Sequence, residues 1–217
     1  MHIRTSVALA ALLMLGVLSC GLDNKSDAMG ENDIITIIAD SSDFEQLSDV
    51  IENAFARPFF TPQPESWFRW KRYDLADLLD HKRDRNILII APLDGKNSMG
   101  EYMRSALDTS VQALVREGAE HVFVKKDFWY REQTVMHLTG KSMQDLRNFM
   151  AENAQQLEFF FKQAWDEREL ARLRALPREE EIEERLLSEH GFTLALIKSW
   201  FIAKDSVEIR SVLLRRQ

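Results

Sequence analysis

Two short runs of β-branched and aliphatic residues constrain the fold of this chain more than any other feature. One is a β-branched run within Asp33 to Asp40 (DIITIIAD), and it stops at a polar group, Asp40-Ser41-Ser42-Asp43, that suits a helix cap. The other lies within Arg85 to Leu93 (RNILIIAPL), has four aliphatic residues in a row and is closed by Pro92. Runs of this kind, bounded by cap or turn residues, are typical of buried strands. The sequence therefore predicts a sheet built around these two strands.

Helical spacing alternates with the strands along the first part of the chain. Apolar residues recur every three or four positions from Phe44 to Phe55, and again from Tyr102 to Glu117. A longer apolar stripe predicts one helix over 142–176, with Ser142 and Asp145 as approximate capping residues. Short strand-like runs follow to the end of the chain. This order predicts an α+β fold in which a mixed β-sheet packs with amphipathic helices.

The first twenty residues, MHIRTSVALAALLMLGVLSC, form a separate segment. Arg4 supplies one positive charge, and Val7 to Leu18 is a continuous apolar run of about a dozen residues. A helix that crosses a bilayer needs about 20 such residues, so this run is too short to span and is typical of a secretory signal peptide. We expect residues 1–19 to be cut away.

The apolar run ends in Val17-Leu18-Ser19-Cys20, which resembles the lipobox of bacterial lipoproteins. There the cysteine is acylated and the peptide is cut before it. Cys20 is the only cysteine of the chain, which excludes an internal disulfide. We expect Cys20 to carry lipid that holds the protein on a membrane; the alternative is an ordinary signal peptide with a chance cysteine. Gly21 rather than Asp follows, which favours an outer-membrane lipoprotein facing the periplasm.

The mature chain is acidic. Without Arg4 it carries 27 basic residues against 35 acidic ones, a net charge of −8. Binding of nucleic acid demands a concentrated basic face, so we expect no nucleic-acid partner. Residues 20–32 are polar and lack apolar periodicity, which predicts a flexible tether. The rest of the chain, 33–217, is long enough to bury one substantial core, and we expect it to form a single α+β domain.

The order of these features resembles a family of Gram-negative lipoproteins that is catalogued as a domain of unknown function. The segments that carry the resemblance are the lipobox cysteine, the loop 62–65 (PQPE) before Trp67-Phe68, residues 85–88 (RNIL), residues 126–129 (KDFW) with Gln133, the Arg- and Glu-rich end of the long helix, and the closing VLLRR strand. The resemblance implies a lipid-anchored envelope protein and brings no catalytic residue. Members usually continue past this last strand and have a tryptophan where Leu213 stands, so the resemblance also implies a C-terminally truncated chain.

Aromatic and basic residues gather in two stretches that are candidates for binding. Aromatic faces can stack on sugar rings or bury in a partner, while Arg and Lys pair with carboxylate or phosphate. The alternative is that alternate aromatic residues pack the core and the charges face water. The candidate binding residues of the two stretches are Phe59, Phe60, Trp67, Arg69, Trp70, Arg72, Trp129 and Gln133.

Motifs for metal or cofactor chemistry are weak. The histidines after the signal segment are scattered and lack the spacing of a zinc site, which needs three or four convergent ligands. The turn at 94–98 (DGKNS) lacks both the earlier glycine and the hydroxyl residue after lysine that a phosphate-binding loop requires. The sequence therefore predicts no metal, no cofactor and no catalytic residue. His137, in a predicted strand at 134–139, is expected to be half-buried and hydrogen-bonded.

These features together predict a lipid-anchored cell-envelope protein with a non-enzymatic binding or assembly role, whose partner is an envelope protein or a glycan. The alternative is a hydrolase of an envelope polymer, glycan or peptidoglycan, that uses paired carboxylates such as Glu65 and Asp127 as acid and base. The sequence leaves open which of the two applies.

Overall fold

The computed structural model describes residues 25–59 and 62–216. The chain divides into two compact units whose segments interleave in the sequence. The first unit consists of the residues up to Phe44 together with Trp70–Leu146, and the second consists of Glu45–Arg69 together with Arg147–Gln217. The expected single domain over 33–217 stays a prediction, and each unit is described here by itself.

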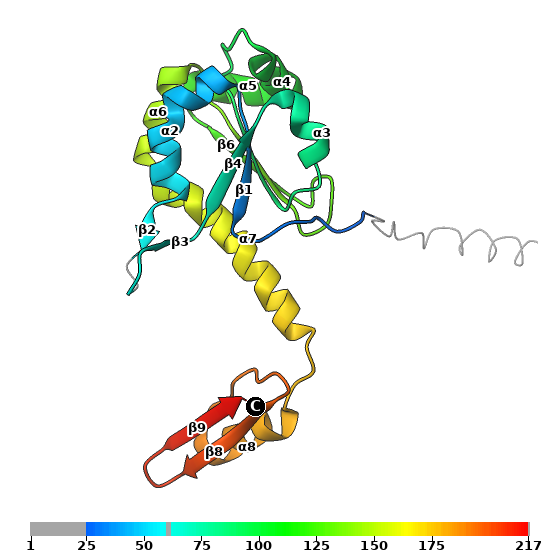
Figure 1. Ribbon diagram of the computed structural model, residues 1–217, viewed down its shortest axis with the longest axis vertical. Coiled ribbons are helices and arrows are strands. Elements are labelled where there is room, and N and C mark those ends of the chain that lie inside the picture. The colour runs from blue at the N-terminus through cyan, green and yellow to red at the C-terminus, as the bar shows by residue number, and fades with distance from the viewer. Residues whose placement is uncertain (1–24, 60–61, 217) are drawn as a thin grey trace, which may run out of the picture. The chain divides into compact units, whose positions relative to one another are not determined.

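A five-stranded mixed sheet forms the centre of the first unit (Figure 1), which confirms the predicted α+β class. Its spatial order is β4-β1-β5-β7-β6. Strands β1, β5 and β7 are parallel neighbours, and β6 runs antiparallel to β7. The register places Ile37 beside Leu88, and Ile89 beside His137. The strand bounds are β1 (Ile34–Ile38), β4 (Arg69–Tyr73), β5 (Asn86–Ile90), β6 (Val122–Lys126) and β7 (Thr134–Leu138).

Strands β5 and β7 are buried along their whole length, as parallel strands covered on both faces must be. On one face the apolar side chains of β1, β5 and β7 pack with those of three helices and a 3₁₀ turn. This buried cluster contains Ile87, Ile89 and Val135 from the sheet together with Met99 and Met103 from one of the covering helices. The covering elements are η2 (Leu75–Asp77), α3 (Leu78–His81), α4 (Ser98–Ala106) and α5 (Thr109–Glu117).

The helix predicted over 102–117 is two helices in the structure. The backbone of Leu107 is extended, and Asp108 begins α5 as its N-cap. The side-chain amide of Gln112 donates to the carbonyl oxygens of Arg104 and Leu107 at 2.8 and 2.9 Å, which satisfies the carbonyl groups that the break exposes. Apolar spacing continues through the break, so the periodicity alone could not reveal it.

A close glycine contact fixes the start of α4. A Cβ added to Gly100 would lie only 2.3 Å from the carbonyl oxygen of Gly95. The side chain of Asn97 caps the helix by accepting from the backbone N–H of Gly100 at 2.9 Å, and it donates to Asp43 at 2.9 Å. The loop after β5 is therefore bound both to its own helix and to the first turn of the helix that follows β1.

In the second unit, aromatic residues from two distant segments pack together. Phe55, Phe68 and Phe161 are fully buried, and Phe161 makes edge-to-face contacts with both of the others. The helix predicted over 142–176 is two helices in the structure. Asn153 separates a shorter helix from the helix of 21 residues that follows it. The elements involved are α2 (Ser41–Phe55), which begins at the end of the first unit, β2 (Pro58–Phe59), β3 (Glu65–Ser66), α6 (Met143–Glu152) and α7 (Ala154–Arg174).

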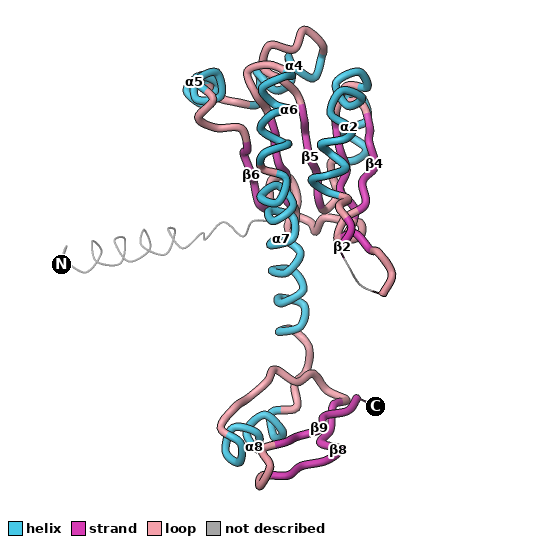
Figure 2. The backbone as a smooth tube through the Cα atoms, turned by 90° about the vertical axis from the view of Figure 1, so that its left-hand side faces the viewer, coloured by secondary structure: helices cyan, strands magenta, loops and turns pink. Residues whose placement is uncertain are grey.

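The last forty residues of the described chain form a helix beside a hairpin (Figure 2): α8 (Glu180–His190), β8 (Trp200–Ser206) and β9 (Ser211–Arg216). Glu183 is buried here and accepts hydrogen bonds from Arg178 and from the backbone N–H of Leu196. The hydrogen bond from Arg178 lowers the pKa of Glu183. No helix within the described ranges is both long enough and apolar enough to cross a bilayer.

Candidate functional site

A small pocket lies at the amino ends of β1 and β5, beside β4. Its volume is about 190 Å³, below the range of roughly 300–1,000 Å³ that is usual for sites of drug-sized ligands. It can therefore hold one small group of a ligand, but not a whole drug-sized molecule. The lining residues are Met29, Gly30, Glu31, Ile34, Thr36, Lys71, Tyr73, His81, Asp84 and Arg85.

A hydrogen-bonded chain of side chains forms one wall of the pocket. The hydroxyl of Thr36 donates to Oδ2 of Asp84 at 2.6 Å, and Nδ1 of His81 lies 2.9 Å from the same oxygen. The imidazole of His81 also stacks on the ring of Tyr73, with centroids 3.6 Å apart. Asp84 therefore fixes the position of His81 and leaves its other ring nitrogen available.

The pocket also has basic residues. Nη1 of Arg85 lies 3.2 Å from a carboxylate oxygen of Glu132, while its buried Nε has no hydrogen-bond partner among the described residues. Lys71 is exposed on β4. These groups give the pocket the donors and positive charge that an anionic group requires.

Next to the pocket, the loop between β6 and β7 is held in a strained conformation. Asp127 and Glu132 both have positive φ, at 50° and 59°, which non-glycine residues rarely adopt. The side chain of Asp127 accepts from the backbone N–H of Glu132 at 2.6 Å. Non-glycine residues in this region cost about 1–3 kcal/mol each and persist only where the surroundings hold them.

The side chain of Gln133 holds this loop in place. Its Oε1 accepts from the backbone N–H of Trp129 at 3.0 Å, and its Nε2 donates to the carbonyl oxygens of Lys82 and Asp84, both at 2.8 Å. Gln133 is almost fully buried. It therefore positions the loop and does not itself present a surface to a partner.

The loop carries three half-buried aromatic residues, of which Phe128 and Trp129 also pack against the core, and each has a cation over its ring. The amine of Lys82 lies 5.1 Å from the ring centroid of Trp129, the guanidinium of Arg83 5.7 Å from that of Tyr130, and the amine of Lys125 4.5 Å from that of Phe128. Distances below about 6 Å are typical of cation–π attraction. We call these six residues the cation–aromatic face.

The N-terminal segment of the described chain lies along this face. Lys25 donates to the carbonyl oxygen of Asp127 at 2.9 Å, Asp27 pairs with Arg131, and the backbone N–H of Met29 donates to the carbonyl oxygen of Arg83 at 2.8 Å. Figure 1 shows the segment, in dark blue, running beside the green loops at the lower end of the sheet. Residues 25–29, within the predicted tether, are thus bonded to the first unit.

The first predicted binding stretch is divided between the two units. In the second unit, Trp67 packs edge-to-face on Trp165, and the amine of Lys162 lies 4.5 Å from the Trp67 ring centroid. In the first, Trp70 packs on Phe44, and Arg72 donates to the carbonyl oxygen of Ala39 and pairs with Asp74.

For the other predicted binding residues of that stretch, the structure gives only their position. Arg69 is exposed, and Phe59 lies in the short strand β2. Phe60 and the predicted lipidation site Cys20 lie outside the described residues.

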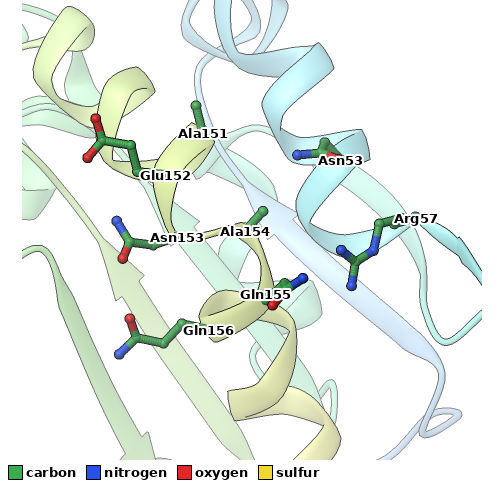
Figure 3. A pocket seen from close by; sticks show the side chains of 8 residues that line it. All are labelled: Asn53, Arg57, Ala151, Glu152, Asn153, Ala154, Gln155 and Gln156. Carbon is green, nitrogen blue, oxygen red and sulfur yellow. The ribbon is translucent and has the colours of Figure 1, made fainter.

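A second hollow, of about 470 Å³, lies in the second unit between the end of α2 and the α6–α7 junction (Figure 3). Asn53 of α2 and Arg57, just after that helix, face Ala151, Ala154 and Gln155 across it. Its walls are polar and open, and the described residues that line it include no aromatic side chain.

One group of possible metal ligands occurs in the described chain: Glu189, His190 and Asp205. Arg185 already pairs with both carboxylates, at 3.0 Å to Glu189 and 2.9 Å to Asp205. His190 lies 2.8 Å from the other oxygen of Asp205. A guanidinium in this position neutralises the charge that would attract a cation, so the group is explained as an ion-pair network.

The two carboxylates of the hydrolase alternative belong to different units. Glu65 is exposed on β3 in the second unit, and Asp127 is exposed in the first. Neither lines one of the two hollows described above.

His137 differs from the expectation of a half-buried, hydrogen-bonded residue. It is almost fully buried in β7, and neither ring nitrogen has a hydrogen-bond partner in the described chain. Tyr102 stacks beside it and Phe128 contacts it edge-on, with centroids 6.3 and 6.2 Å away. Burial, and secondarily the charge of Lys125, lowers the pKa of His137 from 6.5 to about 4.

The model of one protein family, described as Domain of unknown function (DUF8532), matches residues 28–174. The chain belongs to this family. The matched range covers about two thirds of the chain and includes the sheet, the pocket, the cation–aromatic face and α7 to its last residue. No curated protein and no solved structure matches the chain.

Proposed function

We propose that this member of the family is a lipid-anchored cell-envelope protein with a non-enzymatic binding role, held by Cys20 at the outer membrane on its periplasmic side. The cation–aromatic face and the pocket beside it form the binding surface. The observation that carries the proposal is the strained loop at 127–132, which Gln133 holds in place and which aligns three aromatic residues with three cations.

The chemistry of the face favours an anionic partner. Lys82, Arg83 and Lys125 lie over aromatic rings, which do not neutralise a cation as a carboxylate does. Two of the acids near the face are in ion pairs with other cations, Glu132 with Arg85 and Asp27 with Arg131. The charges of Lys82, Arg83 and Lys125 are therefore not used by these two acids.

Support for the anchor comes from the lipobox-like sequence that ends at Cys20. A stable anchor on a membrane requires more than one acyl chain, since each buried methylene contributes only about 0.8 kcal/mol, and bacterial lipoproteins carry several.

The test of the anchor is a Cys20→Ala variant expressed in Gram-negative cells, with Ser26→Ala as the control. Radiolabelled palmitate should enter the wild type and the control but not Cys20→Ala, and only Cys20→Ala should leave the membrane fraction. Unchanged labelling and fractionation of Cys20→Ala would refute the anchor.

The pocket gives the hydrolase alternative one specific observation in its favour. His81, oriented by Asp84, stands in a pocket that also contains Glu31, which is a suitable set of groups for acid–base catalysis. The test is release of soluble fragments from purified peptidoglycan by the wild type, His81→Gln and Asp84→Asn. Release by the wild type alone would support hydrolysis, and no release by any of them would exclude peptidoglycan as a substrate.

A further inference from the structure

We propose that the cation–aromatic face rests on an anionic phospholipid surface, the surface of the same membrane that holds the lipid anchor. This inference depends on the proposed function, because it names the partner of the proposed binding surface.

The first argument is the chemical make-up of the face. Trp129, Tyr130 and Phe128 are half-buried with cations over them, and Trp and Tyr together with Lys and Arg are the residues that favour the boundary between lipid headgroups and acyl chains. Two exposed apolar side chains adjoin it. Met29, bonded through its backbone to Arg83, is 55% exposed, and Leu79, one turn before Lys82 and Arg83, is 78% exposed.

The second argument is charge. Lys82, Arg83 and Lys125 belong to the face, and Lys25 lies beside it on the N-terminal segment. Arg131, on the loop, is paired with Asp27 and is not counted. The chain as a whole carries a net charge of −7, so this concentration of cations is local. Anionic lipid attracts each nearby Lys or Arg by about 1 kcal/mol, or about fivefold in binding.

The third argument is the short distance along the chain between the lipid anchor and the face. Cys20 precedes Lys25 by five residues, which span at most about 17 Å even when fully extended. Lys25 itself is bonded to the loop that carries the aromatic residues. A lipid on Cys20 therefore keeps Lys25, and the loop to which Lys25 is bonded, close to the membrane surface.

The test uses the lipid-modified protein reconstituted in vesicles of brominated phosphatidylcholine, alone or mixed with brominated phosphatidylglycerol. Bromine quenches tryptophan fluorescence on contact. The quenching of Trp129 is obtained by subtracting the fluorescence of Trp129→Phe from that of the wild type. Trp67→Phe is the matched control, because Trp67 also has a cation over its ring, Lys162, but lies in the other unit. We expect quenching of Trp129 in phosphatidylglycerol vesicles and much less in phosphatidylcholine alone.

The triple variant Lys82→Gln/Arg83→Gln/Lys125→Gln should lower the ratio of docked to undocked protein about a hundredfold, and high salt should act in the same direction. The control Lys162→Gln should change nothing. Equal quenching in both vesicle types, or no quenching of Trp129 in either, would overturn the inference. The anchor is read separately, by flotation of the protein with the vesicles, which depends on Cys20. If the wild type floats but Trp129 is not quenched, the further inference fails while the proposed anchor stands.

Discussion

His137 is an imidazole enclosed by apolar and aromatic groups at the middle of the sheet. In the folded chain its pKa is about 4, whereas in the unfolded chain it is the ordinary 6.5. The unfolded chain therefore takes up a proton first as the pH falls. The contribution of neutral His137 to stability is complete above pH 6.5, is lost progressively between 6.5 and 4, and does not change further below 4.

We expect the free energy of unfolding to fall by about 2 kcal/mol between pH 7.5 and pH 5 on account of this group. Urea denaturation of the wild type and of His137→Phe at the two pH values measures it. Phenylalanine cannot take up a proton, so the variant should lose about 2 kcal/mol less over this interval. An identical pH dependence in both proteins would show that His137 does not titrate on unfolding.

Individual residues of the site were only partly predictable. Trp129 and Gln133 were selected because aromatic and polar residues gather there, but the role of Gln133 as a clamp depends on carbonyl groups about 50 residues away in the sequence. The pairing of His81 with Asp84 has a visible i,i+3 spacing, whereas Thr36, the third member, lies 48 residues from Asp84. Contacts at such separations follow from strand order, which one sequence does not reveal.

At the scale of elements, the entry to α4 depends on the absence of a side chain. Gly100→Ala would place a methyl group against the backbone of Gly95, which cannot move away without displacing the capping residue Asn97. We expect this variant to lose about 3 kcal/mol of stability. Urea denaturation at neutral pH measures the loss.

Gly118→Ala is the matched control for that experiment. Gly118 ends α5 with φ of +75°, and an added Cβ would meet nothing within 4 Å. Only backbone strain opposes the change, so the expected loss is about 1 kcal/mol. Equal losses for the two variants would contradict the argument from crowding.

The elements themselves were predicted well where one signal dominates. The aliphatic runs predict β1 and β5 because burial on both faces leaves few polar positions, Thr36 in β1 and Asn86 in β5. The breaks at Leu107 and at Asn153 are not predicted, since apolar spacing carries on across both and the chain turns through local hydrogen bonds. Strand β6, at the edge of the sheet, is half exposed and lacks such an aliphatic run.

For the whole molecule, the segment after α7 is one of the two parts that the family model does not match; the other is residues 1–27. Within the described chain, the hydrogen bonds and ion pairs of residues 177–216 all join residues of that same segment, such as Glu179 with Ser199 and Arg185 with Asp205. A chain that ends after Leu176 should therefore keep the thermal midpoint of the remaining structure within about 3 °C, as circular dichroism can show.

A chain that ends after Gln163 is the control. It lacks Trp165, on which Trp67 and Phe68 pack, and should unfold at a clearly lower temperature. If the longer truncated chain lost as much stability as this control, the final segment would have to support the rest of the fold.

The interleaving of the two units has a consequence for the order in which the protein can mature on the ribosome. Residues 45–69 belong with residues that begin at Arg147, so the first segment emerges about 80 residues before its partner. At roughly 5–20 residues per second, this is a delay of about 4–16 s. During that time Phe55 and Phe68 have no Phe161 to pack against, and a newly made chain presents them to any chaperone in reach.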